Sequence, residues 1–225
     1  MIRNLLVVGA GGFARETVEA VRAVNAVRPT WRLRGLLDDD PATHGRVVSG
    51  VPVLGPIDAV HDEPSALVVI TTGRPDNYGS RPRIAARLDL PDDRYATIVH
   101  PTATVGTTCE VSPGAVLLAH VDLTADVTVG RHVVVMPQVV LPHDVRVGDF
   151  ATLASGVRLG GACGIGEGAY VGAGACVREE LSVGPRALIG MGSVVTRSVP
   201  AERLWIGSPA RDAGPAPLGL AREPA

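Results

Sequence analysis

An aliphatic residue recurs at every sixth position through the second half of this 225-residue chain. Counting from Val105 to Val195, sixteen successive sixth positions hold only Val, Leu or Ile. The next residue is often glycine, and the residue two positions earlier is often small. Six-residue periodicity is typical of a hexapeptide β-helix, in which each hexapeptide supplies one short strand and one turn. Three hexapeptides form one triangular coil, so we expect about five coils.

The same repeat predicts where side chains point. The recurrent aliphatic should face the inside of the prism, with small residues such as Ala151 and Cys163 beside it. An ordinary β-sandwich would instead show strict two-residue alternation. We expect the N-terminal region to cover one end of the prism and residues 204–207, which break the repeat, to cap the other.

Residues before position 100 follow another pattern, in which short apolar runs alternate with helical spacing. This order predicts an α/β, Rossmann-like domain, a small parallel sheet with helices on its faces. Expected strands span 4–8, 32–37 and 66–71, and expected helices span 14–27 and 81–88.

The chain is therefore expected to have three parts. Residues 1–99 form the Rossmann-like domain, and residues 100–211 form the all-β parallel β-helix. Residues 212–225 are rich in Pro, Gly and Ala and are expected to be a flexible tail.

Composition excludes several classes of function. A net charge of -2 without excess basic residues argues against a nucleic-acid surface. No apolar run reaches the roughly 18 residues of a membrane span. Three cysteines without a CxxC pair indicate a reducing, cytoplasmic setting and no metal site.

A glycine-rich loop follows the first expected strand and opens the first helix. Backbone N–H groups at Gly11, Gly12 and Phe13, together with the helix dipole, would favour an anion there. Asp38 and Asp39 end the next strand, where ribose or base contacts are made in such folds. The alternative is a tight turn beside a solvated acidic turn. The domain is short for a nicotinamide oxidoreductase, and no second catalytic domain of that kind follows.

A histidine occupies one turn of the repeat. His143 stands two positions after Leu141 and is followed by Asp144. A neutral imidazole beside a carboxylate is a base with its tautomer fixed. One coil later the same corner carries Gly161, whose N–H could face a ligand. A base beside an oxyanion donor suits acyl transfer, whereas the alternative is a solvated turn histidine.

These features together resemble bacterial sugar acyltransferases of the hexapeptide-repeat superfamily. That group is typified by sialic-acid O-acetyltransferases and UDP-4-amino-sugar N-acetyltransferases. The motifs that carry the resemblance lie at 7–12 (VVGAGG), 35–39 (GLLDD), 98–103 (IVHPTA), 143–144 (HD) and 207–211 (GSPAR).

The resemblance implies a left-handed β-helix and a homotrimer, with acetyl-CoA bound in the crevice between neighbouring prisms. It implies that His143 is the general base and that Asp144 orients it. The backbone at Gly161 would hold the thioester carbonyl.

The resemblance also implies further contacts. Ala173 and Met191 would line the pantetheine path, and Arg211 would meet the CoA phosphates. The glycine-rich loop and the aspartate pair would hold the nucleotide of a sugar substrate. Two positions depart from the amino-sugar enzymes, because Phe13 and Thr152 stand where those enzymes often have histidine.

We therefore expect an acyl-CoA-dependent acyltransferase. An acetyl or related acyl group would pass to an amine or hydroxyl of a sugar or nucleotide-sugar by direct attack on the thioester. One alternative is a non-catalytic nucleotide-sugar binding or assembly protein. Another is a metal-dependent hydratase, but His120, His132 and His143 are spaced to fall on different corners or rungs.

Overall fold

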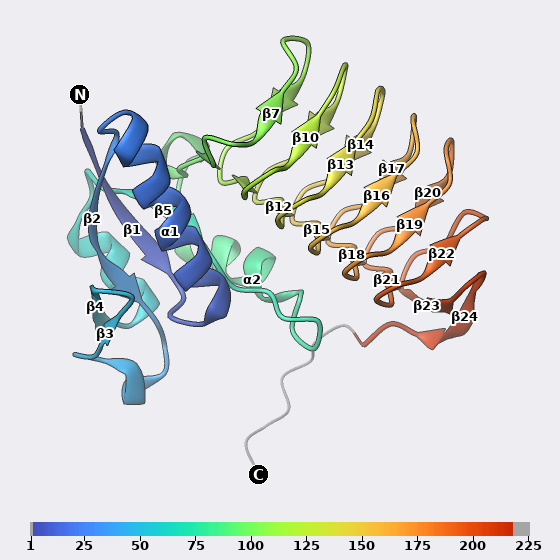
Figure 1. Ribbon diagram of the computed structural model, residues 1–225. Coiled ribbons are helices and arrows are strands. Elements are labelled where there is room, and N and C mark those ends of the chain that lie inside the picture. The colour runs from blue at the N-terminus through green and yellow to red at the C-terminus, as the bar shows by residue number, and fades with distance from the viewer. Residues whose placement is uncertain (1, 218–225) are drawn as a thin grey trace.

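The computed structural model describes residues 2–217, which form a small α/β domain and a three-sided stack of coils (Figure 1). The α/β domain contains a five-stranded sheet in the order β3-β4-β2-β1-β5. Its neighbouring strands are parallel except for β3, which runs antiparallel to β4. The elements are β1 (Arg3–Val8), α1 (Gly12–Val27), β2 (Trp31–Leu37), η1 (Pro41–Thr43), β3 (Val47–Val48), β4 (Val51–Gly55), η2 (Ile57–Asp62), β5 (Leu67–Ile70), α2 (Ser80–Leu88) and η3 (Asp92–Arg94).

The expected strands and helices of this domain all occur, within two residues of their predicted bounds. The pair β3–β4 was not expected. β3 has only two residues, and Pro52 interrupts the apolar pattern of β4, so neither segment carries a strand signal.

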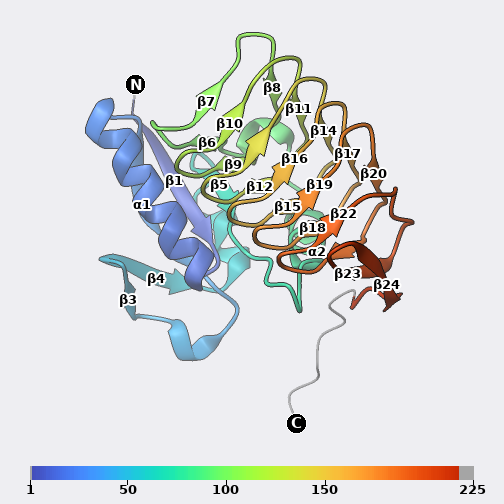
Figure 2. The ribbon, with the colours of Figure 1, turned by 45° about the vertical axis from the view of Figure 1, so that its right-hand side comes forward.

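The remaining residues form a prism with three faces (Figure 2). Each face is a sheet of parallel strands, apart from β24, which runs antiparallel to β23. Face 1 contains β6 (Ile98–Val99), β9 (Val116–Leu117), β12 (Val134–Val135), β15 (Thr152–Leu153), β18 (Tyr170–Val171), β21 (Leu188–Ile189), β23 (Arg203–Gly207) and β24 (Ala210–Pro215). Face 2 contains β7 (Thr104–Val105), β10 (Asp122–Leu123), β13 (Val140–Leu141), β16 (Arg158–Leu159), β19 (Cys176–Val177) and β22 (Val194–Val195). Face 3 contains β8 (Glu110–Val111), β11 (Thr128–Val129), β14 (Arg146–Val147), β17 (Gly164–Ile165) and β20 (Ser182–Val183).

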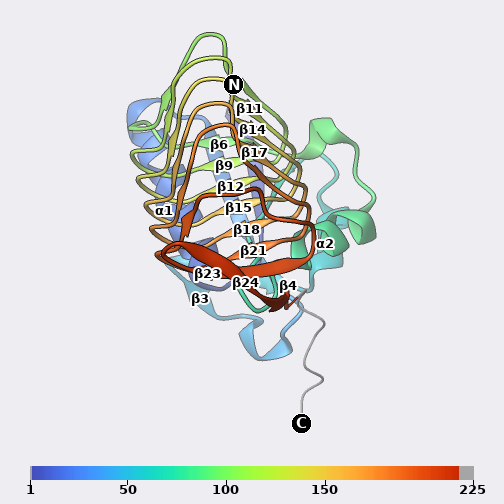
Figure 3. The ribbon, with the colours of Figure 1, turned by 90° about the vertical axis from the view of Figure 1, so that its right-hand side faces the viewer.

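Residues 18 positions apart lie one above the other in this stack, as in the pair Val134 and Thr152. Figure 3 shows the strands that carry them, β12 and β15, in successive coils. The interior is apolar. Of the sixteen recurrent aliphatics, fourteen are buried, which confirms the predicted inward direction. Val111 is half-buried and Val105 is 37% exposed, both in the first coil.

The exposed first coil corrects one expectation. The N-terminal domain covers the side of the prism at face 1, not its end. Outward-pointing Val116 and Leu118 join a buried cluster with Ala14 and Val18 of α1. Because these face 1 residues are apolar on the outside as well as the inside, the side wall is the surface that burial stabilises most.

The C-terminal segment also differs from expectation. β23 continues face 1 by pairing with β21, and it then forms an antiparallel hairpin with β24. Residues 212–215 therefore belong to a strand, and Ala216 is buried beside Tyr78. The flexible tail expected from Asp212 is wrong for these residues, and positions 218–225 lie outside the described residues.

The burial of the recurrent aliphatics yields a stability prediction. Leu153→Ala removes a fully buried side chain in a central coil and should lower the free energy of unfolding by about 2–5 kcal/mol. Val105 occupies the same position of the repeat but is 37% exposed, so Val105→Ala should lower the free energy of unfolding by about 1 kcal/mol or less. Urea unfolding followed by circular dichroism checks both, and equal costs would contradict the inward core.

Candidate active site

His143 lies at the corner where face 2 turns into face 3, between β13 and β14. The turn is fixed from both sides by backbone hydrogen bonds. Asp144 N–H donates to the carbonyl of Ala125 in the coil before, at 3.1 Å, and Ala162 N–H donates to the carbonyl of His143 at 2.9 Å. The side chains of this corner therefore stack in register with the coils.

The imidazole of His143 is held in one orientation. Its Nδ1 lies 2.8 Å from Oδ2 of Asp144. An ionised carboxylate can only accept, so Nδ1 carries the proton and Nε2 is left as the basic nitrogen. A Cβ added at Gly161 would lie 2.5 Å from both Nε2 and Cε1 of His143, so any larger residue here would require the imidazole to move.

The corner is open to solvent in a single chain. The side chains of His143 and Asp144 are 66% and 62% exposed. The carbonyl of Gly161 accepts from Glu180 N–H, whereas its own N–H has no hydrogen-bond partner within residues 2–217. The basic nitrogen of His143 and the backbone of Gly161 thus adjoin at one surface, an arrangement that suits acyl transfer.

The other predicted cofactor residues lie elsewhere on the chain. Ala173 and Met191 occupy the corner between faces 1 and 2, where Met191 is 80% exposed. Arg211 lies on β24. Thr152 is buried on face 1, where its hydroxyl accepts from Arg81 at 2.7 Å. One chain therefore does not bring these residues to His143.

A second candidate site is a cavity of about 270 Å³ at the carboxyl ends of β1, β2 and β5. α1 begins here without a side-chain cap, so its first N–H groups are available to a ligand. The lining residues come from three loops: Gly9, Ala10, Gly11, Gly12, Phe13, Asp38, Thr71, Thr72, Gly73, Arg74, Asn77 and Ser80.

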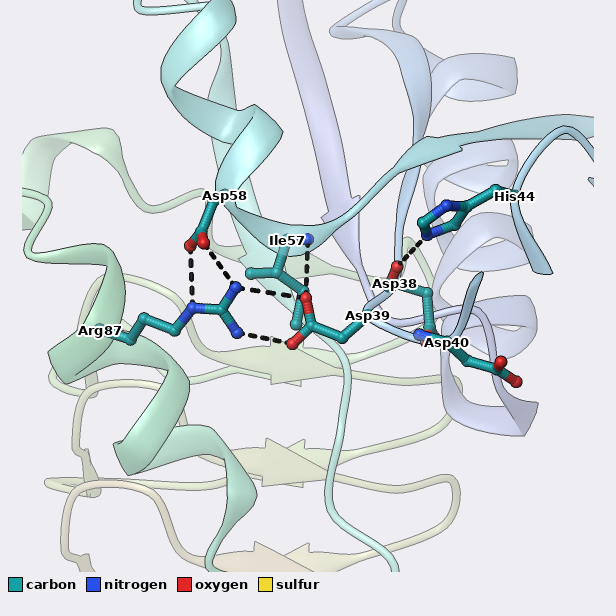
Figure 4. Close-up of polar contacts among 7 residues, drawn as sticks. All are labelled: Asp38, Asp39, Asp40, His44, Ile57, Asp58 and Arg87. Carbon is teal, nitrogen blue, oxygen red and sulfur yellow. Dashed lines mark hydrogen bonds and ion pairs between the residues drawn. The ribbon is translucent and has the colours of Figure 1, made fainter. Parts of the chain in front are cut away.

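The structure separates the two predicted aspartates. Asp38 lines the cavity, and its Oδ2 accepts from Ala10 N–H at 2.8 Å, which holds the glycine-rich loop. Asp39 does not line it. Figure 4 shows Arg87 between the carboxylates of Asp39 and Asp58, with Arg87 Nη1 2.6 Å from Asp39 Oδ2.

The Asp39 carboxylate also accepts from Ile57 N–H at 3.1 Å. Hydrogen bonding to Arg87 lowers the pKa of Asp39 below its usual value. Its expected role in substrate binding is therefore corrected to a structural one, because its oxygens already hold η2 and α2 to the end of β2.

The third loop of the cavity, residues 71–80, was not among the site residues expected from the sequence. Its polar members include Thr72, Asn77 and Ser80. A signal was present, because Thr71 directly follows an apolar strand and the carboxyl ends of parallel strands meet at one edge of the sheet.

The cavity and His143 lie on opposite sides of the same chain. The N-terminal domain packs on face 1, and His143 stands at the corner between faces 2 and 3, which is the corner opposite face 1. In Figures 1 and 2 the turns that follow β10, β13 and β16 point away from the N-terminal sheet. A single chain therefore does not bring its two candidate sites together.

Comparisons with known proteins all find similarity to transferases built from hexapeptide repeats or to sugar acetyltransferases. A family model described as bacterial transferase hexapeptide (six repeats) matches residues 126–161. The UDP-N-acetylbacillosamine N-acetyltransferase of Bacillus subtilis (strain 168) is 32% identical over 120 residues, 52% of each chain. The match thus spans about half the length of that curated relative.

Solved structures match almost the whole chain. PerB from Caulobacter crescentus, in complex with CoA and GDP-perosamine, has a TM-score of 0.83 at 26% identity, covering 95% of this chain and 99% of that one. The acetyltransferase domain of PglB from Neisseria gonorrhoeae FA1090, with acetyl coenzyme A, has a TM-score of 0.83 at 26% identity, covering 94% and 100%. The chain is thus similar to hexapeptide-repeat sugar acetyltransferases over nearly its whole length in structure and over about half of it in sequence.

The stack of parallel strands fits the left-handed β-helix of this family of acetyltransferases. The three histidines considered for a hydratase metal site fall on three different corners, as their spacing predicted. His132 is buried and stacks on Phe150 with ring centroids 5.0 Å apart. Within residues 2–217, no group of three His, Cys, Asp or Glu side chains could hold a metal ion, and no helix is long and apolar enough to cross a membrane.

The close approach of Gly161 to His143 can be tested. Gly161→Ala should displace the His143 imidazole, because the new Cβ would overlap its ring. Gly164→Ala is the matched control, since its Cβ would have no neighbour nearer than 3.9 Å. Imidazole resonances in side-chain NMR spectra should change in the first variant and stay in the second; an unmoved ring in Gly161→Ala would contradict the geometry.

Proposed function

We propose that this protein is an acetyl-CoA-dependent N-acyltransferase that acts on the amino group of a nucleotide-linked sugar, with His143 as general base. The observation that carries the proposal is the contact of the free Nε2 of His143 with Gly161. The solved relatives support the substrate class, because one of them is a perosamine N-acetyltransferase from Caulobacter crescentus in complex with CoA and GDP-perosamine.

The chemistry follows from the two groups at this corner. His143 Nε2 removes a proton from the acceptor nitrogen as that nitrogen attacks the thioester carbonyl carbon. Gly161 N–H donates a hydrogen bond to the oxyanion that forms. When the C–S bond breaks, the imidazolium returns the proton to the CoA sulfur. Asp144 keeps Nδ1 protonated throughout and stabilises the imidazolium.

The acceptor would bind in the Rossmann-like domain, in the cavity beside the glycine-rich loop. The free N–H groups at the start of α1 suit a phosphate, and Asp38 suits a donor of the ribose or base. Phe13 adds an apolar ring to the lining where related enzymes often have histidine. The ring can stack on a base or sugar, so a nucleotide-linked acceptor still fits.

The two candidate sites would meet between chains of a homotrimer. His143 would face the cavity of a neighbouring chain, and Ala173, Met191 and Arg211 would contact CoA that lies against the His143 corner of another prism. The exposure of His143, at 66%, supports this arrangement, because acyl transfer needs a site from which water is excluded. A shallow groove of about 460 Å³ lies on face 3 and extends toward the corner between faces 3 and 1, where Gly148, Gly166 and Pro185 line it.

Turnover should depend on His143. His143→Ala should reduce acetyl-CoA-dependent thiol release with a nucleotide amino sugar by roughly 10²- to 10⁴-fold while the fold persists. His120→Ala, an exposed turn histidine at another corner, should leave turnover unchanged. Wild-type turnover in His143→Ala would reject the assignment, and CoA binding without turnover on any amino sugar would favour the non-catalytic alternative.

Sharing of the site between chains can be tested by complementation. Gly11→Leu should fill the cavity without backbone strain, because φ is -81° there and a Cβ would meet nothing within 4 Å. Gly11→Leu and His143→Ala should each be inactive alone. When the two variants are mixed, dissociated and reassembled at random, about a quarter of wild-type activity should return. If the mixture stays inactive although mass spectrometry shows mixed oligomers, each chain carries its own complete site.

A further inference from the structure

Arg81, at the start of α2, is the largest fully buried side chain among residues 2–217, with 1% of its surface exposed. Its guanidinium crosses from the N-terminal domain to the prism. It donates to the carbonyls of Thr72 at 2.7 Å, His132 at 3.1 Å, Phe150 at 2.6 Å and Ala151 at 3.3 Å, and to the hydroxyl of Thr152 at 2.7 Å.

None of these five acceptors is charged. Within residues 2–217 Arg81 forms no ion pair, although buried charges in proteins are normally paired. Burial lowers the pKa of Arg81 to about 10, which still leaves the guanidinium charged at neutral pH. The protein thus keeps a buried positive charge at Arg81, and no negatively charged side chain within residues 2–217 pairs with it.

The charge lies directly behind the cavity of the N-terminal domain. Thr72, which accepts from Nη1 of Arg81, is part of the cavity wall, and so is the next residue, Gly73. A Cβ at Gly73 would overlap Nη1, so only the glycine backbone separates the guanidinium from the cavity. Ser80 Oγ donates to Thr72 Oγ1 at 2.8 Å and ties the same wall to α2.

The other charged side chains near the cavity are exposed or already hydrogen-bonded, unlike the buried charge of Arg81. Arg74 is paired with Asp76, and their side chains are 82% and 66% exposed, so solvent and salt screen them. The Asp38 carboxylate accepts from Ala10 N–H, and from Asp40 N–H at 3.0 Å. The field of a buried, unpaired charge is screened much less than that of an exposed ion pair.

We propose that Arg81 is a specificity-determining residue that makes this cavity select phosphate-bearing ligands over the same ligands without phosphate. The ligand's phosphate would supply the missing counter-charge across the wall formed by Thr72 and Gly73. The inference rests on the proposed function, because it takes this cavity as the acceptor site, and it adds the chemical feature by which an acceptor is chosen.

The competing explanation is a purely mechanical one, in which Arg81 only ties the N-terminal domain to the prism. The two explanations predict different results. A tie would affect charged and uncharged ligands alike and would depend on the forked geometry of the guanidinium. A charge effect acts only on the anionic ligand and survives replacement by lysine.

The test compares the full-length protein with Arg81→Lys, Arg81→Met and Arg81→Gln. Calorimetry measures Kd for GDP against guanosine and for UDP against uridine, without acetyl-CoA. We expect the wild type to bind the diphosphates more tightly than the nucleosides. The ratio of the two Kd values should stay within about threefold of wild type in Arg81→Lys and fall about tenfold in both neutral variants. Arg94→Met is the control, because Arg94 also donates to backbone carbonyls, those of Ala66 and Glu63, away from the cavity.

Several outcomes would overturn the proposal. An unchanged preference in folded Arg81→Met or Arg81→Gln would do so, as would equal losses in the lysine and neutral variants. If the neutral variants do not fold, the wild type still decides, because equal Kd values for diphosphate and nucleoside contradict selection by charge. No binding of either ligand, together with His143-dependent acetylation of a free amino sugar, would reject this inference and leave acyl transfer standing.

Discussion

The backbone hydrogen bonds that join each coil to the next are the constraint on which the rest of the structure depends. They place residues 18 positions apart directly above one another, so each corner of the prism becomes a column of stacked turns. At one corner this stacking puts Gly161 against His143, and a single extra carbon there would collide with the ring. The buried aliphatics keep every coil the same size, so this register persists along the prism.

The position of the N-terminal domain decides what one chain can do alone. Apolar residues on the outside of face 1 draw the domain to the side of the prism, and Arg81 joins the two through acceptors at Phe150 and Thr152. The same side chain backs the wall of the ligand cavity. One buried contact thus links the orientation of the domain, the shape of the cavity and its charge, which is why we regard Arg81 as more than a structural arginine.

Docking on face 1 also leaves the cavity and His143 on opposite sides of the chain. A reaction that needs both must use two chains, and the exposure of the His143 corner agrees with a surface that is completed by a neighbour.

The different surroundings of Asp38 and Asp39 follow from the backbone at the end of β2. Neighbouring residues on a strand end point in opposite directions, so one carboxylate reaches the cavity and the other reaches Arg87 and Ile57.

The amino-acid sequence alone determined the coils, their inward residues and the approach of Gly161 to His143, because all of these follow from a local repeat of six. The pairing of His143 with Asp144 was also readable, because the two residues are adjacent in the chain. The alternation of strands and helices before residue 100 was equally readable from hydrophobic spacing. Only the tertiary structure decided which prism face the domain covers, which aspartate faces the cavity, that residues 212–215 form a strand and that Arg81 is buried without a counter-charge. These depend on contacts between residues far apart in the chain, for which no local pattern exists.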